Sequence, residues 1–551
     1  MPKTVIQHVL GRLKDIGIEN IFGVAGDYAF PVQDAIVQYP GINWIGCCNE
    51  LNAGYAADGY ARVRGIGALS TTYGPGELGA ISAIGGAYAE NVPLFHLTGM
   101  PTRAAQHKRQ LVHHTLGNGE FDFFAKMAGP VVSARAILSP QNAVYETERL
   151  IAHALYHRRP VYMAIPSDVA DQEALGSAQP FEASRSNPDS LKAAIDAILS
   201  ALDSAGSACI LPGMLAKRIG LQSELQALVD ASGMPFATMF ADKSVLDEQQ
   251  PSFIGMYDGR LMNPDVRAFV ESCDQVMTVG TLMTDFNTGA FTARLDPMKT
   301  IAIKHHYTRI GQREFQDVEM GDVLSALAGL VKRRDEKTSL QPPPSARQTT
   351  GSGGDAITAD ALYPRWANFL RPNDIVVAET GTASMGLAFA QMPTGAAFHN
   401  QTLWGAIGWA TPAAFGAAVA VPDQRVVLFT GEGSHQMTAQ EISQMGRRGL
   451  KPTIFVLNNS GYLIERLLCK DPKIAYNDLA AWRYSELPHA LGCDGWFTRR
   501  VATCAELDQA LEQASQNVSA SYIEIVTDEY AAPPLPQRLH ENRATLYAYA
   551  T

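Results

Sequence analysis

Two stretches near the end of the chain decide the fold: residues 426–433 read VVLFTGEG, and residues 453–461 read TIFVLNNSG. Each is a short apolar run that ends in Gly or Asn, a pattern typical of a buried strand followed by a loop. Twenty-four residues separate Gly433 from Asn458. Ligands bind at the carboxyl ends of parallel strands in open sheets, so the two loops together predict a ligand site.

The two loops are rich in potential oxygen ligands. Glu432 offers a carboxylate, Asn459 an amide oxygen and Gly461 a backbone carbonyl, a set that suits Mg²⁺. Gly433 and Ser434 lead towards a helix predicted over residues 440–446, and amides at a helix N-terminus favour phosphate. The alternative is two ordinary loops, because Gly and Asn are common turn formers.

The order of helix, apolar strand and Gly-rich turn recurs along the whole chain. It predicts parallel sheets that are covered by helices on both faces. The expected fold class is therefore α/β, with three doubly wound parallel-sheet domains. The predicted strands are residues 21–24, 68–72, 92–97, 161–166, 208–211, 235–238, 275–280, 300–304, 375–379, 425–430, 453–457 and 521–526.

A segment rich in Pro, Ser, Thr and Gly, residues 337–356, is predicted to be an extended linker. With it, the 551 residues divide into predicted domains 1–185, 186–336 and 357–551. The middle domain has no GxGxxG, so a bound dinucleotide is not indicated.

Composition excludes several classes of protein. The net charge of −11, from 44 basic and 55 acidic residues, argues against a general nucleic-acid binder. We expect no membrane span and no signal peptide, because there is no run of 18 apolar residues and no apolar core at the N-terminus. Seven cysteines without a CxxC motif suit a cytoplasmic protein without structural zinc.

Several further segments carry a family resemblance. With the GEG and NNSG loops, the chain resembles the thiamine-diphosphate-dependent 2-keto-acid decarboxylases, which act on pyruvate, indolepyruvate, phenylpyruvate or branched-chain keto acids. The resemblance covers nearly the whole chain. Its segments are 26–28 (GDY), 48–62 (CNELNAGYAADGYAR), 71–78 (TTYGPGEL), 113–117 (HHTLG), 403–408 (LWGAIG) and 461–465 (GYLIE).

This resemblance implies pyrimidine-binding, middle and diphosphate-binding domains, with thiamine diphosphate and Mg²⁺ as cofactors. It implies non-oxidative decarboxylation to an aldehyde and carbon dioxide through a thiamine-diphosphate ylid and an enamine. Glu50 should face the pyrimidine and promote formation of the ylid. The residues implied to be catalytic are Asp27, Glu50, His113, His114 and Glu465. All of them except Glu50 form a proton-transfer cluster.

Further positions match the cofactor site of the family. Gly405 should accept from the aminopyrimidine through its carbonyl, and Ile407 should bend the cofactor. Thr382 should touch the diphosphate, although a helix N-cap is an equally good interpretation of this threonine. The full cofactor-binding set is Glu50, Thr382, Gly405, Ile407, Glu432, Gly433, Ser434, Asn459 and Tyr462, and the metal set is Glu432, Asn459 and Gly461.

The substrate pocket can also be placed by resemblance. Members restricted to pyruvate carry larger aromatics at the positions of Ser384 and Met385, so we expect room for branched, long or aromatic keto acids. In the alternative, residues 538–551 fill that room and the substrate is pyruvate. The matching positions are Phe286, Thr380, Ser384, Met385, Ile464 and Leu468.

In this family the first domain of one subunit faces the third domain of another. The resemblance therefore implies a homodimeric active site, and dimers that pair into a homotetramer, with no nucleic-acid or membrane partner.

Two residues depart from the family pattern, and a second His pair falls outside it. Glu432 replaces the usual Asp, and its extra methylene means that either the loop withdraws or metal affinity drops. His435 stands where an apolar residue is usual, and we expect it to add nothing to cofactor binding. The second His pair, His305 and His306, is interpreted as structural.

Three other functions are compatible with parts of this pattern. An acetolactate-synthase-like carboligase uses the same cofactor but generally lacks the histidine pair and Glu465. An oxidase would bind FAD in the middle domain, for which the sequence gives no support. A non-catalytic cofactor-binding subunit is favoured by Glu432 and opposed by the intact catalytic set.

Overall fold

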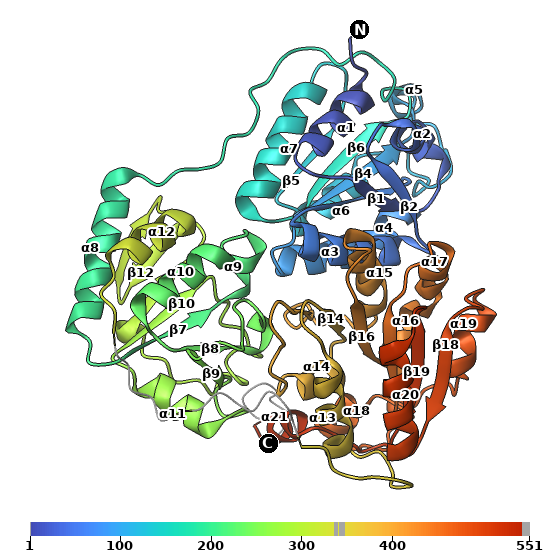
Figure 1. The fold of residues 1–551 in the computed structure, drawn as a ribbon. Coiled ribbons are helices and arrows are strands. Elements are labelled where there is room, and N and C mark those ends of the chain that lie inside the picture. Colours follow the sequence, from blue (N-terminus) through green and yellow to red (C-terminus); the bar gives the residue numbers. More distant parts are fainter. Residues whose placement is uncertain (1, 335–339, 341–347, 543–551) are drawn as a thin grey trace. The chain divides into compact units, whose positions relative to one another are not determined.

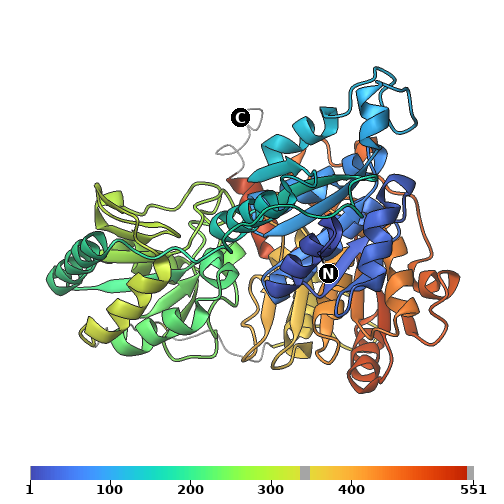
Figure 2. The same ribbon diagram turned by 90° about the horizontal axis from the view of Figure 1, so that it is seen from above.

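The computed structural model describes residues 2–334, 340 and 348–542. It contains three mainly parallel β-sheets, each flanked by helices (Figures 1 and 2). The chain divides into two compact units. The first comprises Met1–Ala183, Trp404–Asp423 and Thr438–Leu450, and the second comprises Ser184–Leu403, Gln424–Met437 and Lys451–Thr551.

The first unit is built on a six-stranded sheet of order β2-β1-β3-β4-β6-β5 in which all neighbours are parallel. Its strands are short, apolar and mostly buried, as expected for a sheet covered on both faces. They are β1 (Asn20–Gly23), β2 (Asn43–Gly46), β3 (Gly67–Thr71), β4 (Leu94–Met100), β5 (Ala134–Ile137) and β6 (Val161–Pro166).

Helices cover both faces of this first sheet (Figure 1). On one face α1 and α7 bury Val9, Leu13 and Leu150 against Phe95 and Met163. On the other face α3 and α4 pack on the strands, and α15 packs on α3. The helices are α1 (Val5–Asp15), α2 (Phe30–Gln38), α3 (Glu50–Arg64), α4 (Pro75–Ala89), α5 (Arg103–His107), α6 (Phe123–Ala128), α7 (Ala143–His157), α15 (Ala410–Ala420) and α17 (Ile442–Arg447).

The second unit holds two sheets. The middle sheet has seven strands in the order β13-β12-β11-β10-β7-β8-β9. They are β7 (Ala208–Pro212), β8 (Phe236–Thr238), β9 (Phe253–Met256), β10 (Gln275–Val279), β11 (Thr300–Ile303), β12 (Tyr307–Ile310) and β13 (Arg313–Gln316). One face is covered by α8 (Pro188–Ser204), α10 (Gln222–Ser232) and α12 (Met320–Leu330), and the other by α11 (Pro264–Ser272).

The third sheet is parallel throughout, in the order β15-β14-β16-β17-β19-β18. Its strands are β14 (Ile375–Ala378), β15 (Ala397–His399), β16 (Val426–Gly431), β17 (Thr453–Asn458), β18 (Phe497–Val501) and β19 (Ser521–Val526). One face buries Phe429 and Phe455 under Trp366 and Leu507, which come from α13 (Ala359–Phe369) and α20 (Cys504–Gln516). The short helices at its ends are α14 (Thr382–Leu387), α16 (Glu432–Thr438), α18 (Leu463–Leu468) and α21 (Pro534–Glu541).

All twelve predicted strands are present, within three residues at their ends. The described residues contain seven further strands that were not predicted: β2, β5, β9, β12, β13, β15 and β18. The middle sheet differs from the prediction at one edge, where β11, β12 and β13 pair antiparallel. The connections between these strands are too short for a crossover helix, so the chain can only turn back on itself. Of the predicted linker, residues 337–339 and 341–347 lie outside the described residues, and 348–356 contain no helix.

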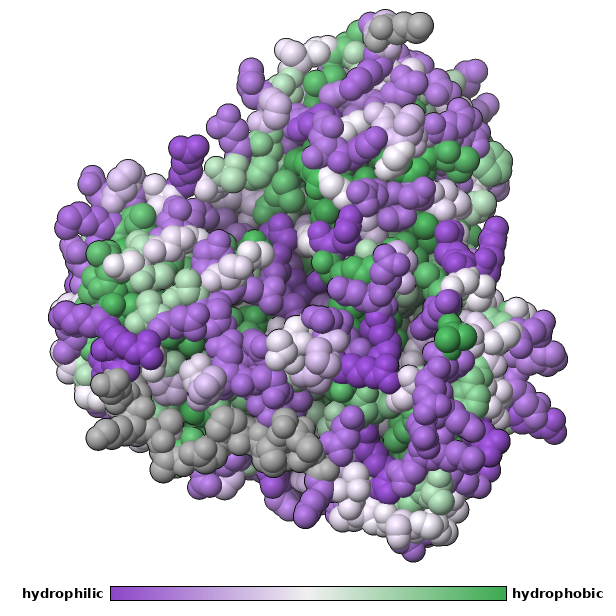
Figure 3. Space-filling view, viewed as in Figure 1, coloured by the Kyte–Doolittle hydropathy of each residue, from purple (hydrophilic) through white to green (hydrophobic). Residues whose placement is uncertain are grey.

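Hydrophilic side chains are spread over the face of the molecule in Figure 3, with hydrophobic ones between them. Among the described residues, no helix is both long and apolar enough to cross a membrane. The seven cysteines are all free thiols.

Candidate active site

Four of the predicted residues belong to loops and helix ends of the first unit. Asp27 and His113 form a close pair, with 2.6 Å between Asp27 Oδ2 and His113 Nε2. The ring of Tyr28 stacks on His113 at 4.7 Å, and its hydroxyl lies 3.3 Å from His113 Nδ1. Burial opposes ionisation of Asp27, but hydrogen bonds from His113 and from the Tyr28 backbone outweigh it and lower the pKa of Asp27. Tyr28 is a positioning residue that sequence reasoning missed, although it lies inside the matching GDY segment.

His114 is held beside this pair by an unusual backbone conformation. Its φ is +63°, and its ring lies edge-on to His113 at 4.8 Å. Gly74, with φ of +66°, makes this possible, because a Cβ at residue 74 would lie 2.2 Å from the His114 carbonyl oxygen. The imidazole Nδ1 of His114 is buried and has no hydrogen-bond partner among the described residues. One ligand atom from each of Asp27, His113 and His114 lies within 4.8 Å of the others.

Glu50 is the first residue of α3, which Asn49 caps by accepting from the Asn52 amide at 2.8 Å. A carboxylate at a helix N-terminus is favourable. The side chain lies over the start of α4, where Gly76 and Gly79 leave room for it: added Cβ atoms would lie 3.4 Å and 3.3 Å from Glu50. Glu50 is only partly buried.

Gly405 and Ile407 lie in the loop that precedes α15 in the first unit. Gly405 has φ of +67°, and Thr438 Oγ1 donates to the neighbouring Gly408 carbonyl at 2.7 Å. No hydrogen bond among the described residues joins Gly405 or Ile407 to Glu50, Asp27 or the histidines.

The predicted metal ligands meet at the carboxyl ends of β16 and β17 in the second unit. Glu432 Oε1 accepts from the backbone amides of Asn459 at 3.0 Å and Gly461 at 2.9 Å. The longer side chain is therefore accommodated by the loop, which binds its carboxylate directly. Sequence reasoning missed Arg466, which holds the loop by donating to the carbonyls of Asn459 at 3.1 Å and Ser460 at 2.6 Å. Arg466 is 5% exposed.

The side-chain amide of Asn459 faces the other two predicted ligands. With its nitrogen turned towards them, it donates to Gly461 O at 2.8 Å and to Glu432 Oε1 at 3.2 Å. With its oxygen turned towards them, a carboxylate, an amide oxygen and a backbone carbonyl lie together, and such oxygen donors suit Mg²⁺. The residues present therefore fit Mg²⁺.

Burial raises the pKa of Glu432 to about 7, against the opposing effect of the Gly461 and Asn459 amides and of Arg466. The helix predicted over residues 440–446 is present as α17, which begins two residues later at Ile442, but the prediction missed α16, which begins at Glu432 directly after β16. An acidic residue in the first turn favours an early start. Thr438, with φ of −141°, ends α16, and α17 covers part of the predicted range.

The remaining cofactor positions lie close to the same end of the third sheet. Gly433 and Ser434 are in the first turn of α16, as the phosphate prediction requires. Thr382 is the first residue of α14 and Gly381 is its N-cap, so Thr382 is not the capping residue. Tyr462 is the N-cap of α18, and Glu465 is exposed on that helix without a side-chain hydrogen bond among the described residues.

Four of the six predicted pocket residues share one apolar cluster. Phe286 and Ile464 pack against a buried group that includes Met385 and Leu468. Ser384 is buried on the same helix as Met385, and the hydroxyl of Thr380 donates to Gln401 O at 2.8 Å. Leu535 and Leu539 of α21 are part of the cluster. The C-terminal segment thus contributes to this cluster, although residues 543–551 lie outside the described residues.

His435 and the second histidine pair both make structural contacts. His435 is fully buried and its Nε2 lies 2.9 Å from the hydroxyl of Tyr522. Burial lowers the pKa of His435 to about 3, so the ring is neutral. His305 and His306 stack at 3.8 Å, and His306 Nδ1 lies 2.8 Å from Glu319.

The comparisons with known proteins identify the family of the chain. Three family profiles of thiamine pyrophosphate enzymes match: the N-terminal TPP binding domain at residues 3–123, the central domain at 195–330 and the C-terminal TPP binding domain at 379–525. A solved structure from Mycobacterium smegmatis, assigned as a thiamin diphosphate-dependent enzyme, shares the fold with a TM-score of 0.78 at 22% identity. It covers 96% of this chain and 100% of its own.

Closer relatives are named alpha-keto-acid decarboxylase. The protein of Mycobacterium avium is 38% identical over 537 residues, which is 97% of this chain and 95% of the relative. That of Mycobacterium tuberculosis H37Rv is 38% identical over 524 residues, 93% and 92% of the two chains. With three matching domains and relatives of this similarity over almost its full length, the chain belongs to the thiamine-diphosphate-dependent 2-keto-acid decarboxylases.

Proposed function

We propose that this decarboxylase acts on 2-keto acids with branched, long or aromatic side chains, such as 2-ketoisocaproate, phenylpyruvate or indolepyruvate. The observation that carries the proposal is the apolar cluster that contains the flexible thioether of Met385, which follows the small buried Ser384 on α14. A methionine adapts to ligands of different shape, whereas an aromatic ring at this position would fill the space.

The alternative substrate is pyruvate, and Leu535 and Leu539 favour it to the extent that they fill the cluster. The experiment compares kcat/KM for 2-ketoisocaproate and phenylpyruvate with that for pyruvate. We expect the bulky acids to be preferred, and Met385→Trp to lower their kcat/KM by more than about tenfold while pyruvate turnover is kept. Met298→Trp, at a methionine that is 58% exposed, is the matched control. Preference of the unaltered enzyme for pyruvate would refute the proposal.

We propose that Mg²⁺ binds Glu432, Asn459 and Gly461 and links the protein to the diphosphate of the cofactor. The amides of Gly433 and Ser434 in the first turn of α16, together with Thr382, would receive the phosphate oxygens. When bound, thiamine diphosphate would supply a nucleophilic thiazolium carbon for the keto carbonyl and a positively charged ring that can accept the electron pair left by carbon dioxide.

The chain's own residues would supply proton transfer. Glu50 would hold the aminopyrimidine through a carboxyl hydrogen bond, with Gly405 and Ile407 as its other supports. Asp27 and His113 already share a hydrogen bond at 2.6 Å, so they can hold one proton as a pair. With His114 and Glu465 they would protonate the product carbon and assist release of the aldehyde.

We further propose that the active site is completed between two subunits, in dimers that pair into a cytoplasmic homotetramer. Asp27, Glu50 and the two histidines belong to one compact unit, and Glu432, Asn459 and Glu465 to the other. Co-expression of Glu50→Gln with Glu465→Gln tests this, because a mixed dimer would contain one intact site. We expect about a quarter of normal activity from a statistical mixture. An inactive mixture, with mixed dimers verified by mass spectrometry, would show that each site is built within one chain.

A further inference from the structure

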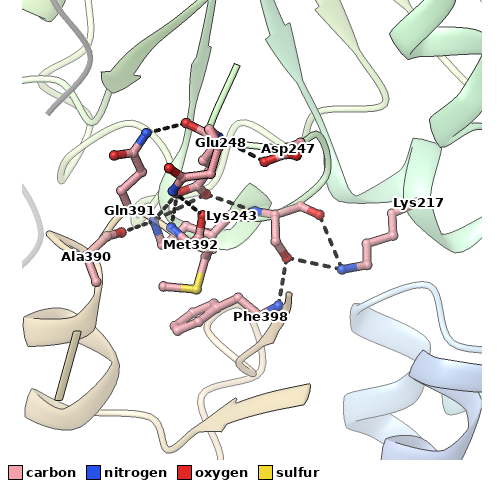
Figure 4. Close-up of polar contacts among 10 residues, drawn as sticks. Lys217, Lys243, Asp247, Glu248, Ala390, Gln391, Met392 and Phe398 are labelled. Atoms are coloured by element: carbon pink, nitrogen blue, oxygen red, sulfur yellow. Dashed lines mark hydrogen bonds and ion pairs between the residues drawn. The ribbon is translucent and has the colours of Figure 1, made fainter. Parts of the chain in front are cut away.

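A pocket that shares no lining residue with the proposed active site lies between α10 and two loops of the second unit. Its volume is about 590 Å³, within the range of small-molecule sites. Much of its wall is apolar, with Val245, Leu246, Met392, Pro393 and Ala396. The neighbouring contacts are shown in Figure 4.

Lys217 is the only lysine that lines this pocket among the described residues. It is partly buried on α9 (Met214–Arg218) and points towards the loop that carries Ser244 (Figure 4). Its Nζ donates weakly to Ser244 Oγ at 3.2 Å and to Ser244 O at 3.4 Å. No carboxylate of the described residues lies within 4.0 Å of it. The amine therefore lacks the ion pair that usually keeps a buried lysine charged.

Nearby Lys243 shows the opposite environment. Its side chain is 2% exposed and pairs with Glu248 at 3.1 Å. It also donates to Ala390 O at 2.8 Å, and Glu248 accepts from the Met392 amide at 2.9 Å (Figure 4). Lys243 is thus a buried but fully bonded ammonium, which makes it a natural comparison for Lys217.

Burial and a neighbouring cation favour the neutral form of Lys217. Burial, together with the guanidinium of Arg218, lowers the pKa of Lys217 to about 7. Glu248 opposes this effect but is already paired. The other charged groups of the pocket are Asp230 and Asp247. A desolvated lysine beside a second cation is a recognised way to obtain a nucleophilic amine.

We propose that Lys217 is a reactive lysine that condenses reversibly with uncharged carbonyl compounds, specifically with aldehydes that have apolar chains. The two aspartates disfavour an anionic ligand, whereas the apolar wall suits a hydrophobic chain. The decarboxylase reaction itself supplies aldehydes. This inference concerns a site apart from catalysis and is tested with added aldehyde, so it stands or fails independently of the proposed substrate.

Imine formation begins at the neutral amine of Lys217. The ammonium first loses its proton to solvent, and the neutral nitrogen attacks the aldehyde carbon to form a carbinolamine. Loss of the hydroxyl as water leaves an imine, and hydrolysis reverses the step. The neutral imine nitrogen has no N–H and can no longer donate to Ser244, whose hydroxyl also accepts from the amide of Phe398 at 2.7 Å in β15, the edge strand of the third sheet.

The test uses the purified full-length enzyme without keto acid. Phenylacetaldehyde is added at pH 7.5 with cyanoborohydride, which reduces each imine to a stable secondary amine, and the labelled lysines are identified by peptide mass spectrometry. At this pH about three quarters of an amine with a pKa of 7 is neutral, against about one thousandth for an ordinary lysine. We expect Lys217 to be labelled more than about tenfold faster than exposed Lys192, with a rate that levels off above about pH 7.

Two controls keep the result interpretable. Lys217→Arg retains the positive charge and removes the primary amine, so pocket labelling should vanish while surface labelling continues. Lys243 should remain unlabelled in the unaltered protein, since its labelling would reveal local unfolding. Lys217 labelling no faster than that of Lys192, or a rate that keeps rising to about pH 10, would overturn the proposal.

Discussion

The carboxylate of Glu432 accepts a hydrogen bond from the backbone amide of Gly461 at 2.9 Å, which joins the ends of two adjacent strands. The side chain is 2% exposed, and its pKa is raised to about 7. A metal-ligand carboxylate must be ionised to bind Mg²⁺, so a proton competes with the metal at this residue.

This competition predicts a pH dependence of magnesium binding. Below about pH 7 the affinity should rise about tenfold for each pH unit, and above it the affinity should level off. The stability of the metal-free protein should change in the opposite direction and fall as pH rises. Because the folded pKa lies above the unfolded value, the folded state holds a proton that the unfolded state releases, and Glu432 contributes less stability as pH rises from about 4.5 to 7. Calorimetry in buffers of different ionisation enthalpy should detect proton release at pH 6 and none at pH 8.5.

Glu432→Gln separates the charge from the hydrogen bonds. A glutamine oxygen still accepts from the amides of Asn459 and Gly461, so the unfolding temperature of the metal-free protein at pH 8 should stay equal or rise. Magnesium-dependent binding of thiamine diphosphate should weaken by more than about tenfold. Glu512→Gln, at an exposed position, is the control. Unchanged cofactor binding in Glu432→Gln would remove this residue from the metal site.

Glu50→Gln should lower turnover by more than about a hundredfold, because proton transfer at the aminopyrimidine needs a carboxyl group. Exchange of the thiazolium C2 proton for deuterium in the bound cofactor, followed by NMR after acid quench, should slow in parallel. Cofactor affinity should change much less. Near-normal exchange and turnover would refute the role of Glu50.

His114→Ala should slow release of the aldehyde more than it weakens cofactor binding. Pre-steady-state analysis of quenched intermediates measures the first quantity and fluorescence titration the second. Gly74→Ala is a second variant that tests the position of His114. The added Cβ would lie 2.2 Å from the His114 carbonyl oxygen and would displace it. This variant should reduce turnover with His114 still present. Loss of cofactor binding with normal release in His114→Ala would count against the assigned role.

The buried pair of Lys243 and Glu248 gives a prediction about stability. Lys243→Met leaves the carboxylate of Glu248, which is 0% exposed, without its cation. We expect a loss of about 3 kcal/mol, visible as a lower unfolding midpoint. Adding Glu248→Leu should recover much of it, because the unpaired charge is then gone. A double variant no better than the single one would show that the pair stabilises through its geometry.

The sequence was sufficient for twelve of the nineteen strands among the described residues, and it was insufficient for the other seven and for the ends of some helices. Val426–Gly431 and Thr453–Asn458 are buried on both sides, so their apolar runs and Gly or Asn ends mark them clearly. The start of α16 at Glu432 could not be read, because Gly433 and Ser434 resemble a turn and only the local amides make the first turn helical. The strands β12 and β13 are largely exposed, so their sequences contain no apolar run that would mark them.

The candidate site was predictable where local motifs carry it. Glu432, Asn459 and Gly461 lie together as their position after adjacent strands requires. Tyr28, which stacks on His113, and Arg466, which holds the Asn459–Gly461 loop, were missed. Both act through contacts that the chain makes only after folding, and a lone Tyr or Arg gives no such signal in a sequence.

The central claim is that this chain uses thiamine diphosphate and Mg²⁺ to decarboxylate bulky 2-keto acids. The most direct measurement is carbon dioxide and aldehyde release from pyruvate, 2-ketoisocaproate, phenylpyruvate, indolepyruvate and benzoylformate, with and without each cofactor. We predict aldehyde formation from the bulky acids that requires both cofactors and is faster than from pyruvate. Turnover that is independent of Mg²⁺, or acetolactate in place of aldehyde, would contradict the account.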